Sequence, residues 1–281
     1  MKKSEINIRD PFVLYEDGVY YMYGTRGKNF GVHTGGFDVY VSRDLENWEA
    51  RECFDSAAFG LNDGVNWAPE VHKYEGKYYL FATFNYEGKL RGTHILSSSS
   101  PLGPFEPHSD GQITKKEWEC LDGTFYVEDG EPYMVFCHEH TQIIDGAICY
   151  VRLSHDLKRA VDEPVFLFKA SEPYYANKCP EGTHYVTDGP FMYRGKNGRL
   201  FMIWSTFIDE KYAECLVRFN SGSIKGGFEH MPPLILNDGG HGMIFDSADG
   251  LYLTYHSPNS SLSERPFFRR IEDEGDTLAV K

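Results

Sequence analysis

The stretch DPFVLYEDGVYYMY, from Asp10 to Tyr23, decides the fold of this chain because related versions of it recur four more times. Each version pairs an opening residue with Gly or Pro, then has an apolar run, a Gly-containing turn and a second, aromatic-rich run. The later copies begin at Ala68, Asp122, Asp188 and His241, so successive starts lie 53 to 66 residues apart. A period of this length that fills most of the chain indicates a repeat architecture.

Within each copy, the order of residues is typical of a β-hairpin. In the first copy the turn Glu16-Asp17-Gly18 separates two runs rich in Val, Tyr and Phe, which favour strands. Further short strand-like runs follow each hairpin, so each unit is expected to hold four antiparallel strands. Five such units predict an all-β, five-bladed β-propeller that occupies residues 1–281 as one domain. A β-sandwich is the alternative, but it explains the turns and not the long period.

The composition narrows the possible partners. A formal net charge of -14 makes an acidic protein a poor ligand for nucleic acid or for an anionic membrane surface, whereas a neutral sugar is compatible with it. No apolar run reaches the about 18 residues of a membrane span. The first residues, MKKSEINIRD, lack the apolar segment of a secretory signal, so we expect a cytoplasmic protein. No protein partner is implied.

The cysteines give little guidance about function. The chain has six of them, without a CxxC pair or the spacing of a metal site. Their even number permits disulfides, but free thiols packed as small apolar residues are the preferred interpretation.

The residues that open the repeats are the candidate active-site residues. In a propeller the first strand of each blade runs beside the central channel, so Asp10, Asp122, Asp188 and His241 are expected to face one cavity, with Ala68 as a neutral member. A single Asp there is equally explained as a turn residue. Several carboxylates in one cavity cannot all ionise at their ordinary pKa, so one can stay protonated while another acts as a base. Hydrolysis of a glycosidic bond requires this division of roles.

Five phrases at the expected blade starts carry a resemblance to a known family. They are Arg9-Asp10-Pro11, Trp67-Ala68-Pro69-Glu70-Val71, Leu121-Asp122-Gly123-Thr124-Phe125, Asp188-Gly189-Pro190 and Gly240-His241-Gly242-Met243-Ile244. Through them the chain resembles glycoside hydrolase family 43, the five-bladed propeller glycosidases of arabinan and xylan breakdown. The resemblance covers essentially the whole chain.

The resemblance implies a role for each of these residues. Asp10 corresponds to the general base that deprotonates water, and Asp122 to the aspartate that orients the acid and raises its pKa. Asp188 stands where the family normally has a glutamate as general acid. His241 matches a histidine at the channel floor that often contacts a bound ion or its water, commonly calcium, and no other cofactor is implied. Enzymes of this family invert the anomeric configuration, with roughly 6.5–9.5 Å between acid and base.

The aspartate at position 188 leaves the identity of the acid open. Its carboxyl group is one methylene, or about 1.5 Å, shorter in reach than that of glutamate, and a misplacement of about 1 Å can cost on the order of a hundredfold in rate. Asp188 remains the preferred acid. Glu70, Glu139 and Glu181 are the alternatives.

Several other residues are expected to contact the sugar. Trp67 offers a stacking platform, with blade packing as the structural alternative, and Phe30 lies in a Gly-rich loop that could wall the subsite. Family enzymes often bring a late arginine onto the substrate, which corresponds to Arg269 or Arg270. The complete expected substrate-binding set is Phe30, Trp67, Glu70, Glu139, Thr206 and Arg269. His138 and His140 form an HxH pair, but no further metal ligand is in register with them.

The expected function is therefore inverting hydrolysis of oligosaccharides that carry arabinofuranosyl or xylosyl units. A retaining, fructosidase-type propeller is an alternative, although its usual Asn-Asp-Pro-Asn-Gly phrase is missing. The other alternative is a propeller that binds sugar without cleaving it, because the usual acid is replaced at position 188.

Overall fold

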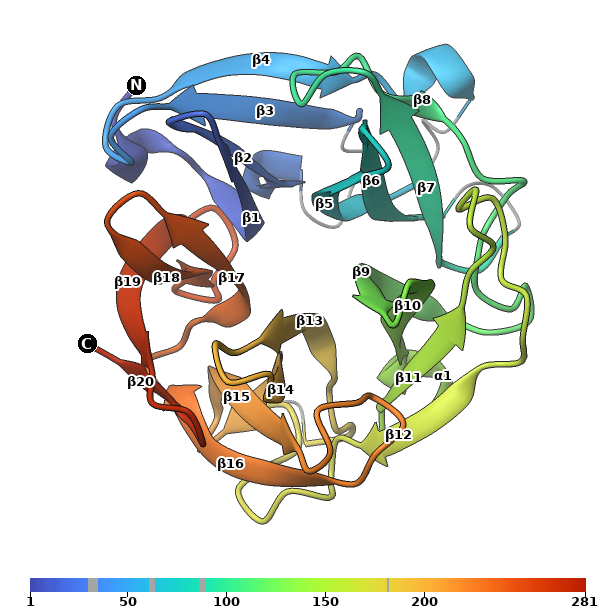
Figure 1. The fold of residues 1–281 in the computed structure, drawn as a ribbon, viewed down its shortest axis with the longest axis vertical. Helices are drawn as coiled ribbons and strands as arrows, with labels where there is room; N and C mark the ends of the chain where they lie inside the picture. The colour runs from blue at the N-terminus through green and yellow to red at the C-terminus, as the bar shows by residue number, and fades with distance from the viewer. Residues whose placement is uncertain (30–34, 61–63, 86–88, 181) are drawn as a thin grey trace.

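Five four-stranded antiparallel sheets surround a common centre in the computed structural model, as Figure 1 shows. The structure describes residues 1–29, 35–60, 64–85, 89–180 and 182–281. Within every sheet the strands are hydrogen-bonded in chain order. The predicted five-bladed β-propeller with four antiparallel strands per blade is therefore confirmed.

The strands have equivalent places in the five blades. The first strands, around the centre, are β1 (Ile8–Glu16), β5 (Asn66–Tyr74), β9 (Cys120–Glu128), β13 (Asp188–Arg194) and β17 (Gly240–Ser247). The second strands are β2 (Val19–Arg26), β6 (Lys77–Phe84), β10 (Glu131–His138), β14 (Leu200–Ile208) and β18 (Gly250–Ser257). The third strands are β3 (Phe37–Ser42), β7 (Gly92–Ser98), β11 (Ala147–Arg152), β15 (Lys211–Phe219) and β19 (Arg265–Asp273). The outermost strands are β4 (Glu49–Phe54), β8 (Glu106–Pro107), β12 (Val165–Lys169), β16 (Phe228–Ile235) and β20 (Leu278–Val280).

Helical segments are short. They are the single-turn 3-10 helices η1 (Lys3–Glu5), η2 (Gly27–Asn29) and η3 (Ala57–Phe59), and the α-helix α1 (His140–Ile143). In the described part of the chain, no helix has the length and apolar character needed to cross a membrane.

Tight turns join the first and second strands of the first three blades. The two-residue loops are Asp17-Gly18, Glu75-Gly76 and Asp129-Gly130, and both residues of each loop have positive φ, between 46° and 82°. This is the geometry of the turn that matches the right-handed twist of a hairpin. The Gly-containing turns read from the sequence therefore fix the register of these hairpins.

A bulge interrupts the first strand of every blade at the same place. Pairing with the second strand skips two residues there, for example between Arg9 and Phe12 and between Gly240 and Met243. One skipped residue in each blade adopts a left-handed conformation, with φ between 46° and 56°, and these residues are Asp10, Ala68, Asp122, Gly189 and His241. Non-glycine residues rarely adopt this conformation, and such strain is concentrated at functional sites.

The ring closes between the fifth and first blades, each of which is built from one end of the chain (Figure 1). Arg9 on β1 reaches the loop before β19, where its Nη1 lies 2.9 Å from Glu264 Oε1. The Glu264 side chain is fully buried and that of Arg9 is 11% exposed. Asn7 donates to the same carboxylate, at 3.3 Å.

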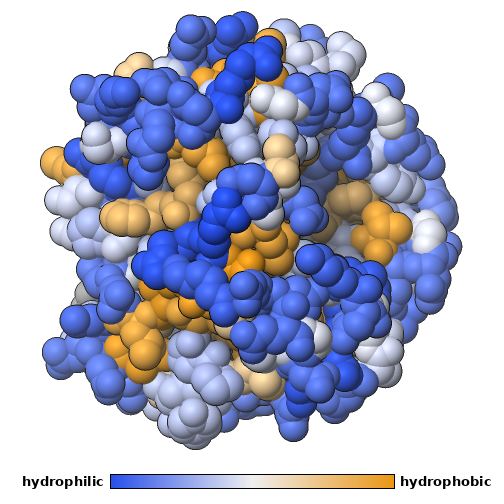
Figure 2. Space-filling view, turned by 60° about the vertical axis from the view of Figure 1, so that its left-hand side comes forward, coloured by the Kyte–Doolittle hydropathy of each residue, from blue (hydrophilic) through white to orange (hydrophobic). Residues whose placement is uncertain are grey.

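Apolar side chains fill the spaces between neighbouring sheets. Trp48 and Trp204 are among the largest fully buried side chains. All six cysteines are buried free thiols, in agreement with the preferred interpretation of the sequence. Figure 2 shows that hydrophilic side chains cover most of one side of the molecule, with hydrophobic ones visible in the gaps between them.

Candidate active site

A pocket of about 280 Å³ opens among the first strands of the blades. It brings together the three aspartates and the histidine that were predicted from the repeat starts. The residues that line it are Arg9, Asp10, Trp67, Arg91, Leu121, Asp122, Glu139, His140, Thr141, Asp188 and His241. Charged side chains therefore dominate its walls.

In four of the five blades, a side chain of the preceding blade holds the left-handed residue of the bulge. That side chain lies near the end of the preceding blade's second strand and accepts a hydrogen bond from the backbone N–H of the left-handed residue. The pairs are His256 with Asp10 (3.2 Å), Thr25 with Ala68 (2.8 Å), Thr83 with Asp122 (2.9 Å) and Ser205 with His241 (2.7 Å). These bonds place the pocket residues and join neighbouring blades at once.

The fourth blade departs from this pattern. The equivalent position in the third blade is Cys137, which pairs with Leu121 in the sheet, and the N–H of Gly189 is instead bound by Asp122 Oδ2 at 3.1 Å. The Asp122 carboxylate thus ties the third blade to the backbone directly after Asp188.

The register corrects one expectation from the sequence. Asp188 is not the equivalent of Asp10, because the left-handed residue of its blade is Gly189. Asp188 is the last residue paired with the second strand before the bulge, which is the position of Arg9 and Trp67 in their own blades. It still reaches the pocket, but from the neighbouring position of the bulge, so the five opening residues are not all in register. The sequence pattern matched Asp188-Gly189 with Asp122-Gly123, whereas in the structure Gly189-Pro190 occupies the two bulge positions that Asp10-Pro11 occupies in the first blade.

Asp10 is stabilised in its ionised form by its neighbours. Burial opposes ionisation, but His241, Arg9 and other partners outweigh it and lower the pKa of Asp10. Its Oδ1 lies 3.1 Å from His241 Nδ1, and its Oδ2 accepts a 2.6 Å hydrogen bond from the Thr25 hydroxyl.

Asp122 and Asp188 are shifted in the opposite direction. Burial, followed by the charges of Asp188 and Asp10, raises the pKa of Asp122 to about 8 against the attraction of His241. Burial also raises the pKa of Asp188, and the charge of Glu139 adds to this effect. Asp188 is the most exposed of the three carboxylates. One pocket therefore holds a carboxyl group whose ionised form is favoured and two whose protonated forms are favoured.

His241 lies between the carboxylates, which favour its imidazolium form. Burial disfavours its charge, but Asp10, Asp122 and Asp188 together raise its pKa to about 9. Its Nδ1 faces Asp10 at 3.1 Å and Asp122 at 3.8 Å. An ion at Nδ1 would require loss of the proton on that nitrogen, and the ion expected near His241 stays a prediction. Across the described ranges, no group of three or more His, Cys, Asp or Glu side chains is arranged to hold one.

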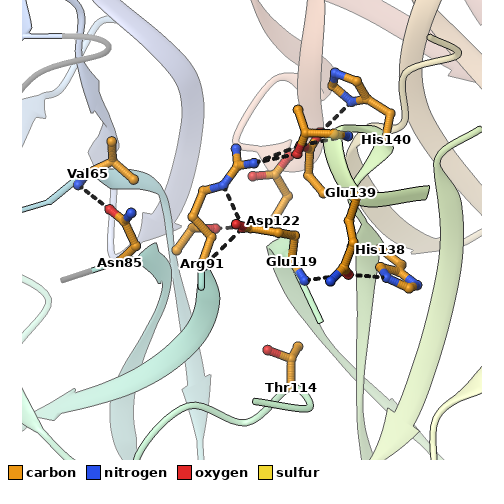
Figure 3. A network of polar contacts seen from close by, with 12 residues as sticks. Val65, Asn85, Arg91, Thr114, Glu119, Asp122, His138, Glu139 and His140 are labelled. Carbon is orange, nitrogen blue, oxygen red and sulfur yellow. Dashed lines mark hydrogen bonds and ion pairs between the residues drawn. The ribbon is translucent and has the colours of Figure 1, made fainter. Parts of the chain in front are cut away.

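Arg91, between β6 and β7, organises the wall beside Asp122. Figure 3 shows its guanidinium lying between Glu119 and Glu139. The Nε–H donates to Glu119 at 2.9 Å, and Nη2 donates to Glu139 at 2.8 Å. The guanidinium carbon also lies 5.5 Å from the centre of the Trp67 ring, a cation–π distance. Trp67 thus forms part of the pocket wall, and its stacking on a sugar ring stays a prediction.

Glu139 lies in the pocket but is strongly acidic. It caps α1, is 1% exposed, and is paired with His140 and Arg91. Burial opposes its charge, yet His140, Thr141 and Arg91 lower its pKa to about 2. The sequence-adjacent His138 is separate from this group: its ring stacks on Trp118 at 4.2 Å and contacts Gln142. The HxH pair therefore does not converge on one point.

The remaining predicted residues are not brought to the pocket lining. Glu70 pairs with His72 at 2.9 Å, and Thr206 is fully buried inside the fourth blade. The exposed Arg269 donates to the main-chain oxygen of Lys281 at 2.8 Å, so it does not serve the pocket as expected. Its neighbour Arg270 instead binds Asp249. Phe30 and Glu181 lie outside the described residues.

The sequence analysis missed several residues that line the pocket or contact its carboxylates. Arg9 stands directly before Asp10 and could have been found from the shared bulge position. Arg91, His140 and Thr141 lie in connections between strands, where the repeat gives no register. Tyr212, on β15, donates its hydroxyl hydrogen to Asp188 Oδ2 at 3.0 Å, and no sequence signal marks it.

Comparisons with known proteins agree with this geometry. The family model described as Glycosyl hydrolases family 43 matches residues 4–275. A crystal structure described as an endo-arabinase from Bacteroides thetaiotaomicron VPI-5482 has 38% sequence identity and a TM-score of 0.90, over 99% of this chain and 98% of that one.

Two curated proteins are also similar. A putative beta-xylosidase of Xylanibacter ruminicola is 24% identical over 248 residues, which cover 80% of this chain and 40% of that protein. The extracellular exo-alpha-(1->5)-L-arabinofuranosidase ArbA of Cellvibrio japonicus (strain Ueda107) is 22% identical over 180 residues, which cover 57% and 47%. The chain thus matches less than half the length of either relative.

Proposed function

The chain belongs to family 43 of the glycosyl hydrolases, and we propose that it hydrolyses arabinofuranosyl-containing oligosaccharides by single displacement with inversion. The observation that carries this proposal is one pocket that brings together Asp10, whose pKa is lowered, and Asp188, whose pKa is raised. An inverting glycosidase needs such a base and such an acid at the same bond.

Asp10 is the proposed general base. Its lowered pKa keeps it ionised, and the Thr25 hydroxyl and His241 fix both of its oxygens. In the reaction Asp10 takes a proton from a water molecule as the water oxygen bonds to the anomeric carbon. The opposing pKa shifts of Asp10 and Asp188 follow the pattern that lets two carboxyl groups divide acid and base work.

Asp188 is the proposed general acid. It is the more exposed carboxyl group, and its raised pKa favours the protonated form that the leaving oxygen needs. Glu139 is a poor rival because its pKa is lowered to about 2, so it is ionised at neutral pH. Its charge instead favours the protonated form of Asp188. Glu70, which pairs with His72 outside the pocket lining, has no access to the same bond.

Asp122 is the proposed orienting residue. Its hydrogen bond to the N–H of Gly189, at 3.1 Å, fixes the backbone that carries the acid. Its carboxyl group also adds to the electrostatic environment of the other pocket carboxylates. The role is therefore structural and electrostatic, without proton transfer to the substrate.

The pocket walls favour a short sugar substrate. A volume of about 280 Å³ lies near the lower end of the roughly 300–1,000 Å³ of small-molecule sites. Trp67 offers an aromatic face, and Arg91 and His140 offer hydrogen-bond donors. We propose arabinofuranosyl units first because a similar structure is described as an endo-arabinase. Xylosyl units are the second candidate because of the putative beta-xylosidase.

Turnover of a matched substrate panel tests this function. The panel contains aryl arabinofuranosides, aryl xylosides and linear arabino-oligosaccharides, and proton NMR records the anomer formed first. We expect cleavage of arabinofuranosyl bonds with inverted configuration, and at least a hundredfold loss for Asp10→Asn. Retained configuration would support the fructosidase-type mechanism instead. Binding of these sugars without any turnover would support a carbohydrate-binding protein.

A further inference from the structure

Tyr212 lies behind the proposed acid and makes a specific contact with it. The residue is on β15 in the fourth blade, and its side chain is 1% exposed. Its hydroxyl group donates to Asp188 Oδ2 at 3.0 Å. Tyr212 does not line the pocket, and Asp188 is the pocket residue to which its hydroxyl group is hydrogen-bonded.

We propose that Tyr212 is a positioning residue that occupies Oδ2 of Asp188 and so keeps the acidic proton on Oδ1, directed to the leaving oxygen. This inference rests on the proposed role of Asp188 as the general acid. It adds a requirement that the carboxyl group alone does not meet, namely that the proton be on the correct one of two equivalent oxygens.

The Tyr212 ring has little freedom to move. It stacks on His256, with ring centres 5.6 Å apart and planes 23° apart, and contacts Phe207 at 5.6 Å. A Cβ added at Gly240 would come within 2.7 Å of the ring, so a side chain there would displace it. The main-chain oxygen of Tyr212 also accepts a 3.0 Å hydrogen bond from Gly239. The hydroxyl group is therefore held at a fixed place behind Asp188.

The chemical state of Tyr212 suits a permanent donor. Burial, followed by the charges of Asp188 and Asp10, raises its pKa well above the ordinary value, so the phenol keeps its hydrogen throughout the working pH range. A protonated carboxyl group has one hydroxyl oxygen and one carbonyl oxygen, and the oxygen that accepts a hydrogen bond is favoured as the carbonyl. The Tyr212 donor thus selects Oδ1 as the oxygen that carries the proton.

The proton balance of the step is simple. The Oδ1–H bond of Asp188 breaks as an O–H bond forms on the leaving oxygen, while the glycosidic C–O bond breaks. Asp188 becomes a carboxylate, and the hydrogen bond from Tyr212 stabilises that charge. Water attacks the anomeric carbon and gives its proton to Asp10. Proton exchange with solvent then restores both groups.

Other charged groups around Asp188 act on its charge. His241 on β17 and His140 on α1 favour ionisation of Asp188, as the Tyr212 hydrogen bond does, whereas Glu139 at the start of α1 opposes it. Asp122 on β9 is also coupled to Asp188 by charge. Among these partners, Tyr212 is the one with a direct hydrogen bond to the carboxyl group in the described structure.

Leaving-group dependence tests the inference. Tyr212→Phe and Asp188→Ala are compared with the unmodified protein on aryl arabinofuranosides whose leaving phenols range from dinitrophenol to phenol. A good leaving group needs no protonation, so we expect Tyr212→Phe to lose less than about threefold in kcat/KM with dinitrophenol but about 10- to 100-fold with phenol. Asp188→Ala should show the same trend more steeply.

Tyr126→Phe is the matched control. Tyr126 is also buried and donates to a carboxylate at 3.0 Å, that of Glu128, away from the pocket lining. We expect this variant to keep the unmodified dependence on the leaving group. A Tyr212→Phe loss that is equal for all phenols, or no loss with any of them, would overturn the inference. If Asp188→Ala itself shows no such dependence, the proposed acid is wrong, which is a separate failure.

A second measurement does not need turnover. Carbon-13 NMR of labelled aspartate follows the titration of the Asp188 carboxyl, identified by its absence in Asp188→Asn. Because the Tyr212 hydrogen bond lowers the pKa of Asp188, the titration of Asp188 should move to higher pH in Tyr212→Phe and stay in place in Tyr126→Phe. No movement in Tyr212→Phe would contradict the contact.

Discussion

Removal of the buried carboxylate of Glu264 should weaken the closure of the ring. In Glu264→Ala, the Arg9 guanidinium loses a partner at 2.9 Å and keeps Asn259 at 2.8 Å. Breaking a buried ion pair costs about 3–5 kcal/mol. Because Arg9 keeps its hydrogen bond to Asn259, we expect a loss at the lower end of this range, about 3 kcal/mol. An unfolding entropy of about 2.1 cal/mol/K per residue converts this, for 281 residues, into a fall in Tm of about 5 °C.

Differential scanning calorimetry of Glu264→Ala and Glu46→Ala provides the comparison. Glu46 pairs with Lys3 at a similar 3.1 Å, but the two side chains are 60% and 29% exposed. Such a surface pair contributes about 0–1 kcal/mol, so the control should lose less than about 2 °C. Equal losses in the two variants would refute the reasoning that burial of the Arg9–Glu264 pair makes it the important contact at the closure.

Three further predictions concern the pocket. The pH profile of kcat/KM should be bell-shaped. Activity should fall at low pH because Asp10 gains a proton below its lowered pKa, and at high pH because Asp188 loses one above its raised pKa. A profile without an alkaline fall would contradict Asp188 as the acid. Glu139→Gln removes a negative charge that raises the pKa of Asp188, so the alkaline limb should move to lower pH, whereas movement upward would oppose this reading. Trp67→Ala should raise KM about tenfold with a smaller change in kcat, because it removes an aromatic face from the pocket. An unchanged KM for arabino-oligosaccharides would mean that Trp67 serves blade packing alone.

The sequence predicted the scaffold well because the repeat encodes it locally. Turns such as Asp17-Gly18 demand positive φ at both residues, and that requirement is visible in the residue types. The convergence of Asp10, Asp122 and His241 also followed, since equivalent positions of a rotational repeat meet at the axis. Asp188 was placed in the same pocket, but one position out of register, because Asp188-Gly189 has the same residue types as Asp122-Gly123 while Gly189-Pro190 fills the two bulge positions.

The surroundings of the carboxylates were harder to predict. Arg91 and His140 come from connections between strands, and Tyr212 comes from a third strand that packs against the next blade. Their positions depend on how neighbouring blades meet, which is a long-range property that no local pattern records. Arg269 was expected at the substrate for its place near the end of the chain, but its side chain binds the C-terminal residue instead.

The comparison of Asp10→Asn with Asp188→Ala on two substrates tests the central claim most directly. Every substrate needs an activated water, so Asp10→Asn should lose at least about a hundredfold in kcat/KM with both dinitrophenyl and phenyl arabinofuranoside. Asp188→Ala should approach the activity of the unmodified protein with the dinitrophenyl substrate and lose about a hundredfold or more with the phenyl one. Equal losses on both substrates for Asp188→Ala, or recovery of Asp10→Asn on the activated substrate, would contradict the assignment of acid and base.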